Sequence, residues 1–385
     1  CWRKHLGGLD MGLTNIRLGD YIERSTINNK ELKYGVDLIV GVNSQGVFTA
    51  PKGNTDGVDL KPYKIVENGA FVYNPTRLEL GSIAYRTEGL CIVSHLYMVF
   101  YLTDEGKKII DPMWLYIYFR RSEFCREVKF RNFGSQRPEF NFNDMSDIVI
   151  PLPDIEIQKK YVDIYNAMLE NQKSYEYRLE DLKLACDAYI EDLKHGIHCK
   201  AIGPYVERHD VRNRTNEIKN VMGVSTSKEF REPTSKVNRN ELSNYKIVRP
   251  RQISFVQTTH NEKVFAYAFN NTEDDIVVTS VNEVFSVDED KLLPEYLCMF
   301  FNRTEFDRYA RFHSWGSARE TFTWDDLVKV EIPIADMKTQ KSIADIYKAY
   351  KERKAINEKL KEQIKDICPI LIKGSIEEAR KAKEA

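Results

Sequence analysis

The chain repeats itself at a spacing of 182 residues. Residues 122–165 align with residues 304–347 without a gap, and 17 of the 44 aligned pairs are identical. The same spacing pairs Tyr63-Lys64-Ile65-Val66 with Tyr245-Lys246-Ile247-Val248. Because a solenoid repeat spans only about 20–50 residues, this spacing indicates that a whole domain is duplicated. Two copies of one domain usually pack about a pseudo-two-fold axis, as subunits of a dimer do.

Each copy alternates short β-branched and aromatic segments with clusters of Gly, Asn, Asp and Pro. This spacing predicts a mainly antiparallel, curved sheet with long loops and short helices. The expected strands are residues 36–42, 69–73, 83–85, 91–102 and 148–150 in the first copy, and 253–256, 264–269 and 276–287 in the second. Helices are expected over residues 111–128 and about 294–309. Each copy is therefore predicted to be one α+β domain.

A helical pattern follows each sheet-forming segment. From Asp154 to about Leu193 no Pro or Gly occurs, and apolar residues recur at helical spacing among many Glu and Lys. The pattern predicts one helix of about 60 Å and a second from about Lys338 to Ile367 that ends at Pro369. Both carry the narrow apolar stripe that is typical of coiled coils. We expect the two helices to pair in antiparallel and to hold the two domains a fixed distance apart.

These patterns divide the chain into five segments. Residues 1–15 are a leader that we exclude from the fold, because the repeat starts at Ile16 and Met11 is a candidate natural start. The remaining segments are a first domain (16–153), a central helix (154–197), a second domain (198–335), and a distal helix with its tail (336–385).

Composition limits the class of protein. The formal net charge is −1, so global basicity does not indicate a nucleic-acid binder, although the electrostatic footprint of such proteins is local. The seven cysteines are scattered and form no C-x-x-C pair, which favours free thiols in a reducing compartment over disulfides or a zinc site. No apolar run is long enough for a membrane span. We expect a soluble, cytoplasmic protein without a metal site.

Motifs for common enzyme chemistry are missing from the sequence. It contains no G-x-x-x-x-G-K-[ST], G-x-G-x-x-G, G-x-S-x-G or H-E-x-x-H. The stretch Asn74-Pro75-Thr76-Arg77 lacks the second proline and the aromatic residue with which adenine methyltransferases hold a flipped base. We interpret it as a turn between two strands, and we predict no catalytic residue.

Basic residues cluster at matching positions of the two copies. Residues 119–137 contain Arg120, Arg121, Arg126, Lys129, Arg131 and Arg137, and the second copy has Arg303, Arg308, Arg311, His313 and Arg319. A further basic span runs from Arg208 to Arg251. Arg and Lys suit phosphate and guanine, whereas Asn and Gln suit adenine. One such cluster is most often a solvated face, but two at matching positions favour nucleic-acid binding.

A doubled motif reads F-x-x-x-G-S-x-R, then I-P-[LI], then Q-K-x-x-x-D-I before a long charged helix. It resembles the specificity subunit (S subunit, HsdS family) of type I restriction-modification systems. The most diagnostic parts are Ile150-Pro151-Leu152-Pro153 with Gln158-Lys159, and Ile332-Pro333-Ile334 with Gln340-Lys341; Asn74-Pro-x-Arg77 with residues 81–85 adds to them. The resemblance covers Ile16 to about Gly374. Ala335 stands where the family often has a second proline, a departure that helix entry tolerates.

The resemblance implies two target-recognition domains separated by two long antiparallel coiled-coil helices. It implies a non-catalytic, DNA-binding subunit of a bacterial defence against foreign DNA, in which each domain reads half of a bipartite double-stranded site and the helices set the gap. The unequal domain sequences predict an asymmetric site. It further implies two docked methyltransferase subunits, which modify adenine with S-adenosylmethionine, and in some systems a nuclease-translocase subunit that uses ATP and Mg. No cofactor is expected on this chain itself.

Candidate site residues follow from the basic clusters and from the resemblance. The candidate DNA contacts are Asn74, Arg77, Arg131, Ser135, Gln136, Arg137, Arg212, Arg214, Gln257, His313, Ser317 and Arg319. The candidates for subunit docking on the helices are Gln158, Tyr165, Leu169, Leu182, Gln340, Ile346 and Leu360. Residues that specify different half-sites should differ between copies, so we assign specificity to unmatched positions such as Gln136 and Ala318. The matched Arg137 and Arg319 are assigned to phosphate or to the fold.

Two other functions stay open. One is an enzyme, either a fused restriction-methylation chain or a nuclease; the missing methyltransferase motifs and the scattered carboxylates count against it. Such an enzyme would change DNA by itself when given magnesium or a methyl donor. The other is a non-DNA scaffold whose duplicated helices recruit partners. Salt-dependent binding to duplex DNA would distinguish the specificity subunit from the scaffold.

Overall fold

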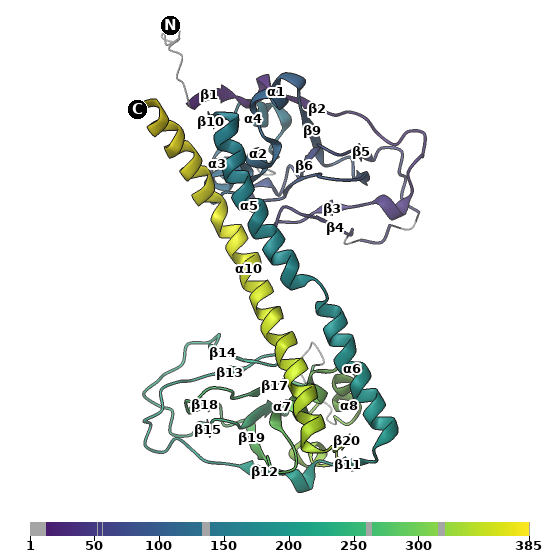
Figure 1. The fold of residues 1–385 in the computed structure, drawn as a ribbon, viewed down its shortest axis with the longest axis vertical. Helices are drawn as coiled ribbons and strands as arrows, with labels where there is room; N and C mark the ends of the chain where they lie inside the picture. The colour runs from purple at the N-terminus through teal and green to yellow at the C-terminus, as the bar shows by residue number, and fades with distance from the viewer. Residues whose placement is uncertain are drawn as a thin grey trace. The chain divides into compact units, whose positions relative to one another are not determined.

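The computed structural model of the chain describes residues 13–51, 53–55, 57–132, 139–258, 264–314 and 320–384. It divides into two compact units. The first consists of Cys1–Ser174 together with Ile356–Ala385, and the second is Tyr175–Ala355. Helix α10 (Met337–Glu384) contributes its N-terminal part to the second unit and the remainder to the first (Figure 1).

A four-stranded antiparallel sheet, ordered β2-β9-β6-β7, is the centre of the first domain. Three two-stranded sheets, β1-β10, β3-β4 and β5-β8, accompany it. The strands are β1 (Leu13–Arg17), β2 (Ile22–Arg24), β3 (Gly41–Val42), β4 (Phe48–Thr49), β5 (Lys64–Val66), β6 (Phe71–Tyr73), β7 (Ile83–Tyr85), β8 (Cys91–Val93), β9 (Met98–Leu102) and β10 (Val149–Pro153).

The second domain repeats this topology strand for strand. Its central sheet is ordered β12-β19-β16-β17, and its two-stranded sheets are β11-β20, β13-β14 and β15-β18. The strands are β11 (Cys199–Ala201), β12 (Val206–His209), β13 (Gly223–Val224), β14 (Phe230–Arg231), β15 (Lys246–Val248), β16 (Ile253–Val256), β17 (Tyr267–Phe269), β18 (Ile276–Val278), β19 (Asn282–Val287) and β20 (Glu331–Pro333). The predicted duplication and the α+β class with antiparallel sheets are confirmed.

Helices in the first unit are α1 (Asp104–Ile109), α2 (Pro112–Phe119), α3 (Ser122–Arg131), α4 (Phe142–Ser146) and α5 (Ile155–Glu176), with 3-10 helices η1 (Leu18–Asp20), η2 (Val36–Leu38) and η3 (Leu78–Leu80). The second unit has α6 (Leu179–Gly196), α7 (Pro294–Asn302), α8 (Thr304–Phe312), α9 (Trp324–Leu327) and η4 (Gly203–Tyr205). The two helices predicted over 111–128 and 294–309 are each broken in two. Arg121 and Arg303 adopt nearly the same extended conformation there, with ψ of 145° in both.

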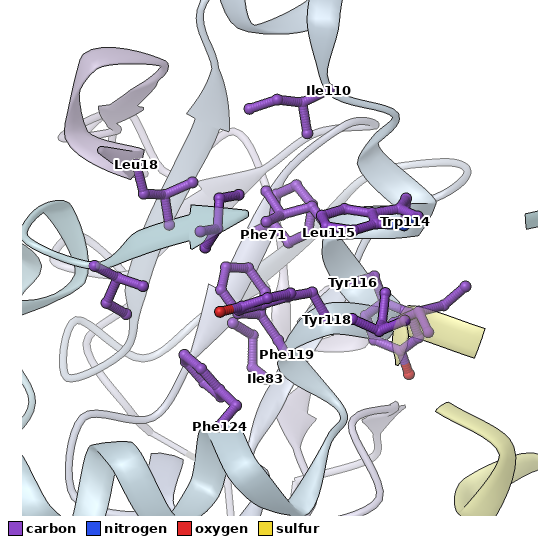
Figure 2. Packing of buried hydrophobic residues seen from close by; sticks show 14 of the residues in the cluster. Leu18, Phe71, Ile83, Ile110, Trp114, Leu115, Tyr116, Tyr118, Phe119 and Phe124 are labelled. Carbon is purple, nitrogen blue, oxygen red and sulfur yellow. The ribbon is translucent and has the colours of Figure 1, made fainter. Parts of the chain in front are cut away.

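The core of the first domain lies between its central sheet and helices α2 and α3 (Figure 2). Helix α2 starts where the carboxylate of Asp111 accepts hydrogen bonds from the main-chain N–H groups of Met113 and Trp114, which is how an N-cap satisfies the first donors of a helix. Phe119 then packs edge-on against Phe71 of the sheet, with the ring centroids 6.0 Å apart.

Helix α5 pairs in antiparallel with the C-terminal part of α10 inside the first unit. Lys160 pairs with Glu378 at 2.8 Å near one end, and the Gln172 amide donates to Asn357 Oδ1 at 2.8 Å near the other. Gly374 permits the close approach, because a Cβ there would lie 2.8 Å from the Tyr161 ring. The predicted antiparallel helix pairing is confirmed for this pair.

The two long helices do not end where the sequence predicts. Arg178, with φ of +61°, interrupts the first predicted helix and separates α5 from α6, although no Pro or Gly is present. Conversely, α10 continues through Pro369 to Glu384. A proline inside a helix removes one backbone hydrogen bond, and buried neighbours such as Leu371 and Ile372 hold the helix together there.

Several predicted strand boundaries are wrong in detail. Strand β1 starts at Leu13 and pairs with Pro153 and its neighbours, so residues 13–15 belong to the fold and not to the leader. Residues 36–38 form η2, and the segments 91–102 and 276–287 each divide into two strands separated by a turn. In each segment a turn of three or four residues lets the chain pass from one sheet to another. The apolar pattern continues through the turn, so the sequence does not reveal the break.

Candidate nucleic-acid interface

One end of the central sheet carries the turn that holds Asn74 and Arg77, two of the candidate residues of the first domain. Tyr73, the last residue of β6, pairs with Met98 of β9 and with Ile83 of β7. Arg24, the last residue of β2, lies toward the same end. We call this edge the loop end of the domain.

The loop end of the second domain has the same construction. Val256, the last residue of β16, pairs with Asn282, the first residue of β19. A matching hydrogen bond closes both ends: Phe140 N–H donates to the Pro75 carbonyl at 3.0 Å, and Phe322 N–H donates to the Gln257 carbonyl at 2.8 Å. The duplication therefore preserves the framework that presents these loops.

The stretch from Asn74 to Arg77 is a turn, as predicted. Asn74 Oδ1 accepts hydrogen bonds from the N–H and the hydroxyl of Thr76 at 3.1 and 2.9 Å. Its backbone N–H donates to the Ser82 carbonyl. This leaves only the amide nitrogen of Asn74 for an external acceptor, whereas Arg77 is exposed at the start of η3.

Helix α3 leads from the core toward the loop end and packs against η3. Near its C-terminal end, Arg131 pairs with Glu127 at 2.7 Å, and both side chains are partly exposed. Ser135, Gln136 and Arg137 follow this helix but lie outside the described residues, as do Ser317, Ala318 and Arg319 in the second domain. Their roles stay predictions.

Several arginines of the matched basic stretches are engaged inside the protein. Arg120 donates to the carbonyls of Gly81 and Ser44, and Arg121 lies over the Tyr118 ring, 3.7 Å from its centroid. Arg303 is buried and pairs with Asp187 at 3.2 Å and with Glu191. The hydrogen bond from Arg303 lowers the pKa of Glu191. These three side chains hold elements of the protein together.

A cluster of polar side chains at the loop end of the second domain converges on Glu283. Arg208 donates from Nε and Nη2 to its carboxylate at 2.8 and 2.7 Å. Lys246 lies 3.4 Å from the same carboxylate, and the Gln257 amide also donates to it. Candidate Gln257 is therefore held by a buried acid. The hydrogen bonds to Glu283 raise the pKa of Arg208.

The remaining candidates in the second domain lie near this cluster or on α8. Arg212 pairs with Asp210 at 2.7 Å and donates to the Asn244 carbonyl, so both of its terminal nitrogens have a partner inside the domain. The bond from Arg212 lowers the pKa of Asp210. Arg214 is exposed. His313 follows α8, with its ring 4.3 Å from that of Tyr309.

Two of the predicted docking residues, Gln158 and Gln340, have no exposed surface. Gln158 accepts from Asp111 N–H at 2.8 Å and donates to the carbonyls of Ile109 and Pro153 at 2.8 and 2.7 Å. Gln340 accepts from Leu293 N–H and donates to the carbonyls of Lys291 and Ala335 in the same arrangement. Both amides fasten the start of a long helix to its own domain. Because they are buried, they offer no surface to a docked subunit.

The other predicted docking residues are also buried within their own unit, some fully and some partly. Tyr165 is buried against Tyr116 and Cys368, and burial raises its pKa. Leu169, Leu182, Ile346 and Leu360 are partly buried. By contrast Tyr189 and Ile356, which the sequence pattern places in the apolar stripe, are exposed.

Two exposed aromatic residues escaped the sequence-based choice of sites. Phe130 on α3 and Phe312 on α8 occupy matching positions and are 81% and 79% exposed. Their identity in both copies was visible in the alignment, but a phenylalanine at helical spacing is read as core. Glu283 was missed because a single carboxylate in a strand shows no partner in the sequence.

No group of three or more His, Cys, Asp or Glu able to hold a metal ion occurs among the described residues. The cysteines in the part of the chain that the structure describes are all free thiols. Within the same residues, no helix is both long and apolar enough to cross a membrane.

The family model of the type I restriction modification DNA specificity domain matches residues 14–180 and again residues 204–366. The chain belongs to this family. Each match contains one loop end and the start of one long helix. The chain is therefore a DNA specificity subunit, a type of subunit that selects DNA and does not itself catalyse.

Solved structures of specificity subunits are similar to this one at low sequence identity. The type I restriction-modification S subunit from M. genitalium is 10% identical, with 97% of this chain and 98% of that chain covered and a TM-score of 0.62. The HsdS subunit from Thermoanaerobacter tengcongensis is 15% identical, with 95% and 96% covered and a TM-score of 0.40. A chain from a structure on complex assembly and conformational transition of the type I R-M system is 15% identical, with 95% and 97% covered and a TM-score of 0.45. No curated protein matches at a comparable level. The first similarity supports the fold of the specificity subunit.

Proposed function

We propose that this specificity subunit reads a bipartite, asymmetric site in double-stranded DNA, with one half-site for each domain. The observation that carries the proposal is the repeated loop end, which presents polar side chains from the same framework in both domains. The residues there differ between the copies, since Pro75 in one corresponds to Gln257 in the other. Different side chains on one framework would select different bases.

The long helices would set the gap between the half-sites. Two readers on one rigid spacer gain affinity only when the half-sites have the matching separation. The buried Gln172–Asn357 hydrogen bond supports a fixed pairing of α5 with α10, because a single buried polar pair specifies the register of packed helices.

The same helices would dock two methyltransferase subunits. Their outer faces carry exposed apolar side chains, which in a soluble protein often mark a contact surface. These residues are Ile164 on α5, Leu184 and Tyr189 on α6, and Ile356 and Ile370 on α10. The docked subunits would methylate adenine with S-adenosylmethionine, and a nuclease-translocase partner, where present, would use ATP and Mg. We place this activity in the bacterial cytoplasm.

Mapping of N6-methyladenine by single-molecule sequencing tests the proposal. Cells that express the chain with its methyltransferase should show a gapped, asymmetric motif, and cells lacking only this chain should lose it. A four-residue insertion between Glu170 and Lys183 should change the gap or abolish methylation while both domains stay folded. An unchanged motif and gap in that variant would contradict the spacer role.

Binding experiments separate the proposal from the scaffold and the enzyme. The purified chain should bind duplex DNA with an affinity that falls steeply with salt, because phosphate contacts release counterions. A scaffold would not bind duplex DNA. An enzyme would cleave or methylate DNA by itself with magnesium or a methyl donor.

A further inference from the structure

The carboxylate of Glu283 is buried at an otherwise exposed edge of the second domain. Its side chain is only 4% exposed, yet it lies at the loop end on β19. A buried acid is costly unless donors surround it, and here Arg208, Lys246 and Gln257 supply them. Three donors on one acid form a rigid cluster within reach of solvent.

The guanidinium of Arg208 has two edges that can each donate a pair of hydrogen bonds, and Glu283 occupies only one of them. A guanidinium carries five N–H donors in a fixed plane. Glu283 accepts from Nε and from Nη2, so the fork formed by Nη1 and the second hydrogen of Nη2 has no partner among the described residues. The side chain is 49% exposed. The Trp324 ring, 6.0 Å away, further limits its movement.

We propose that Arg208, held by Glu283, reads a guanine in the half-site of the second domain. The proposal rests on the proposed function, since it requires the loop end to face DNA. The free fork matches the O6 and N7 acceptors of guanine in the major groove, which is the commonest specific contact of arginine with DNA.

The surrounding charges favour guanine over phosphate. Two carboxylates, Glu283 and Asp210, offset the charges of Arg208 and Lys246, which weakens attraction to a phosphate but leaves the two N–H donors in place. A guanine edge is uncharged, so it depends on donor geometry more than on net charge. The buried acid therefore favours contact of Arg208 with guanine over contact with phosphate.

The first domain lacks this device. Met98 occupies the register position that corresponds to Glu283, because Tyr73 pairs with Met98 as Phe255 pairs with Glu283. Arg24 corresponds to Arg208 and forms no ion pair within the part of the chain that the structure describes. The two half-sites should therefore differ in their dependence on this arginine.

The test uses the full chain and synthetic duplexes of the methylated site, once that site has been mapped. Each guanine is replaced in turn by 7-deazaguanine, which lacks the N7 acceptor but still pairs with cytosine. Loss of the whole bidentate contact in Arg208→Ala should weaken binding to the natural duplex on the order of 5- to 150-fold. The 7-deazaguanine substitution removes only one of the two acceptors, so wild-type protein should lose a part of that factor at one guanine, and Arg208→Ala should no longer distinguish the two duplexes.

Matched variants keep the test decisive. Arg208→Lys retains the charge but replaces the planar fork by an ammonium, so it should discriminate at that guanine less than wild type does. It keeps the test decisive where Arg208→Ala folds poorly. Arg24→Ala should leave that guanine position unaffected. Uniform weakening at every sequence with a shallower salt dependence would mean a phosphate contact and would overturn the proposal, as would full discrimination by Arg208→Lys. Absence of duplex binding by wild-type protein would instead refute the proposed function.

Discussion

Replacement of Gln158 by leucine should destabilise the first unit selectively. The side chain has no exposed surface and satisfies three backbone groups: Asp111 N–H and the carbonyls of Ile109 and Pro153. Each buried group left without a partner costs about 1–3 kcal/mol. Partial relaxation and the added apolar surface of leucine offset some of this, so we expect a loss of about 3–5 kcal/mol in the free energy of unfolding.

The loss is measurable by calorimetry together with hydrogen exchange. For a unit of about 200 residues, each kcal/mol shifts the Tm by about 2–4 °C, which predicts a decrease of about 6–20 °C for the transition of the first unit. Faster exchange should appear at the start of α2 and α5. Gln340→Leu should have the same effect on the second unit, because Gln340 makes the matching bonds to residues 291, 293 and 335.

A charge variant tests whether hydrogen bonding is the cause. Gln158→Glu keeps the size of the side chain but places a carboxylate oxygen against two carbonyl oxygens. It should be at least as unstable as Gln158→Leu at neutral pH and should recover partly on acidification, when the carboxyl group gains a donor. The exposed neighbour Lys159 supplies the control, Lys159→Leu, which should change little. A Gln158→Leu protein within about 1 kcal/mol of wild type would refute the reasoning.

Three further predictions concern α5 and α10. Pro369→Ala should restore a backbone hydrogen bond in α10. It should raise the free energy of unfolding of the first unit by up to about 3 kcal/mol, and its Tm with it; an unchanged Tm would mean that local packing requires the proline. Hydrogen bonds from Lys160 and Tyr161 lower the pKa of Glu378, so its stabilising effect is present above its unfolded pKa and is lost as the pH falls through the folded one. NMR titration should show a low pKa for Glu378 that rises in Lys160→Ala and not in Lys159→Ala. Burial raises the pKa of Cys368 to about 11, so iodoacetamide at pH 8 should label it only after denaturation; rapid labelling of the folded protein would contradict its burial.

The sequence predicted the duplicated architecture because two copies had to satisfy the same local rules. The aligned motifs correspond to matched structural contacts, as the hydrogen bonds of Gln158 and Gln340 demonstrate. Helix breaks were harder to predict. Arg121, Arg178 and Arg303 carry no local breaking signal, yet each adopts a conformation outside the right-handed helix. Arg303 is held by ion pairs with Asp187 and Glu191, whereas Arg178 is exposed.

The candidate site was only partly predictable, since the partners of basic residues lie far away in the sequence. Arg208 meets Glu283 across 75 residues, and Lys228 meets Asp307 across 79. Burial lowers the pKa of Lys228 despite its bond to Asp307, and this lysine supports the fold. A count of basic residues cannot distinguish such internal cations from exposed ones like Arg77 and Arg214.

Arg178, the residue with positive φ between α5 and α6, is a place where the chain can be cut without separating the first unit. It is exposed between α5 and α6, a suitable site for a single tryptic cut. The first unit, however, takes its last helical segment from Ile356–Ala385, and the Trp114 indole donates to Ser375 of that segment. A chain nicked at Arg178 would therefore run as two fragments in denaturing gels and as one particle in native mass spectrometry, since the first unit is assembled from both pieces.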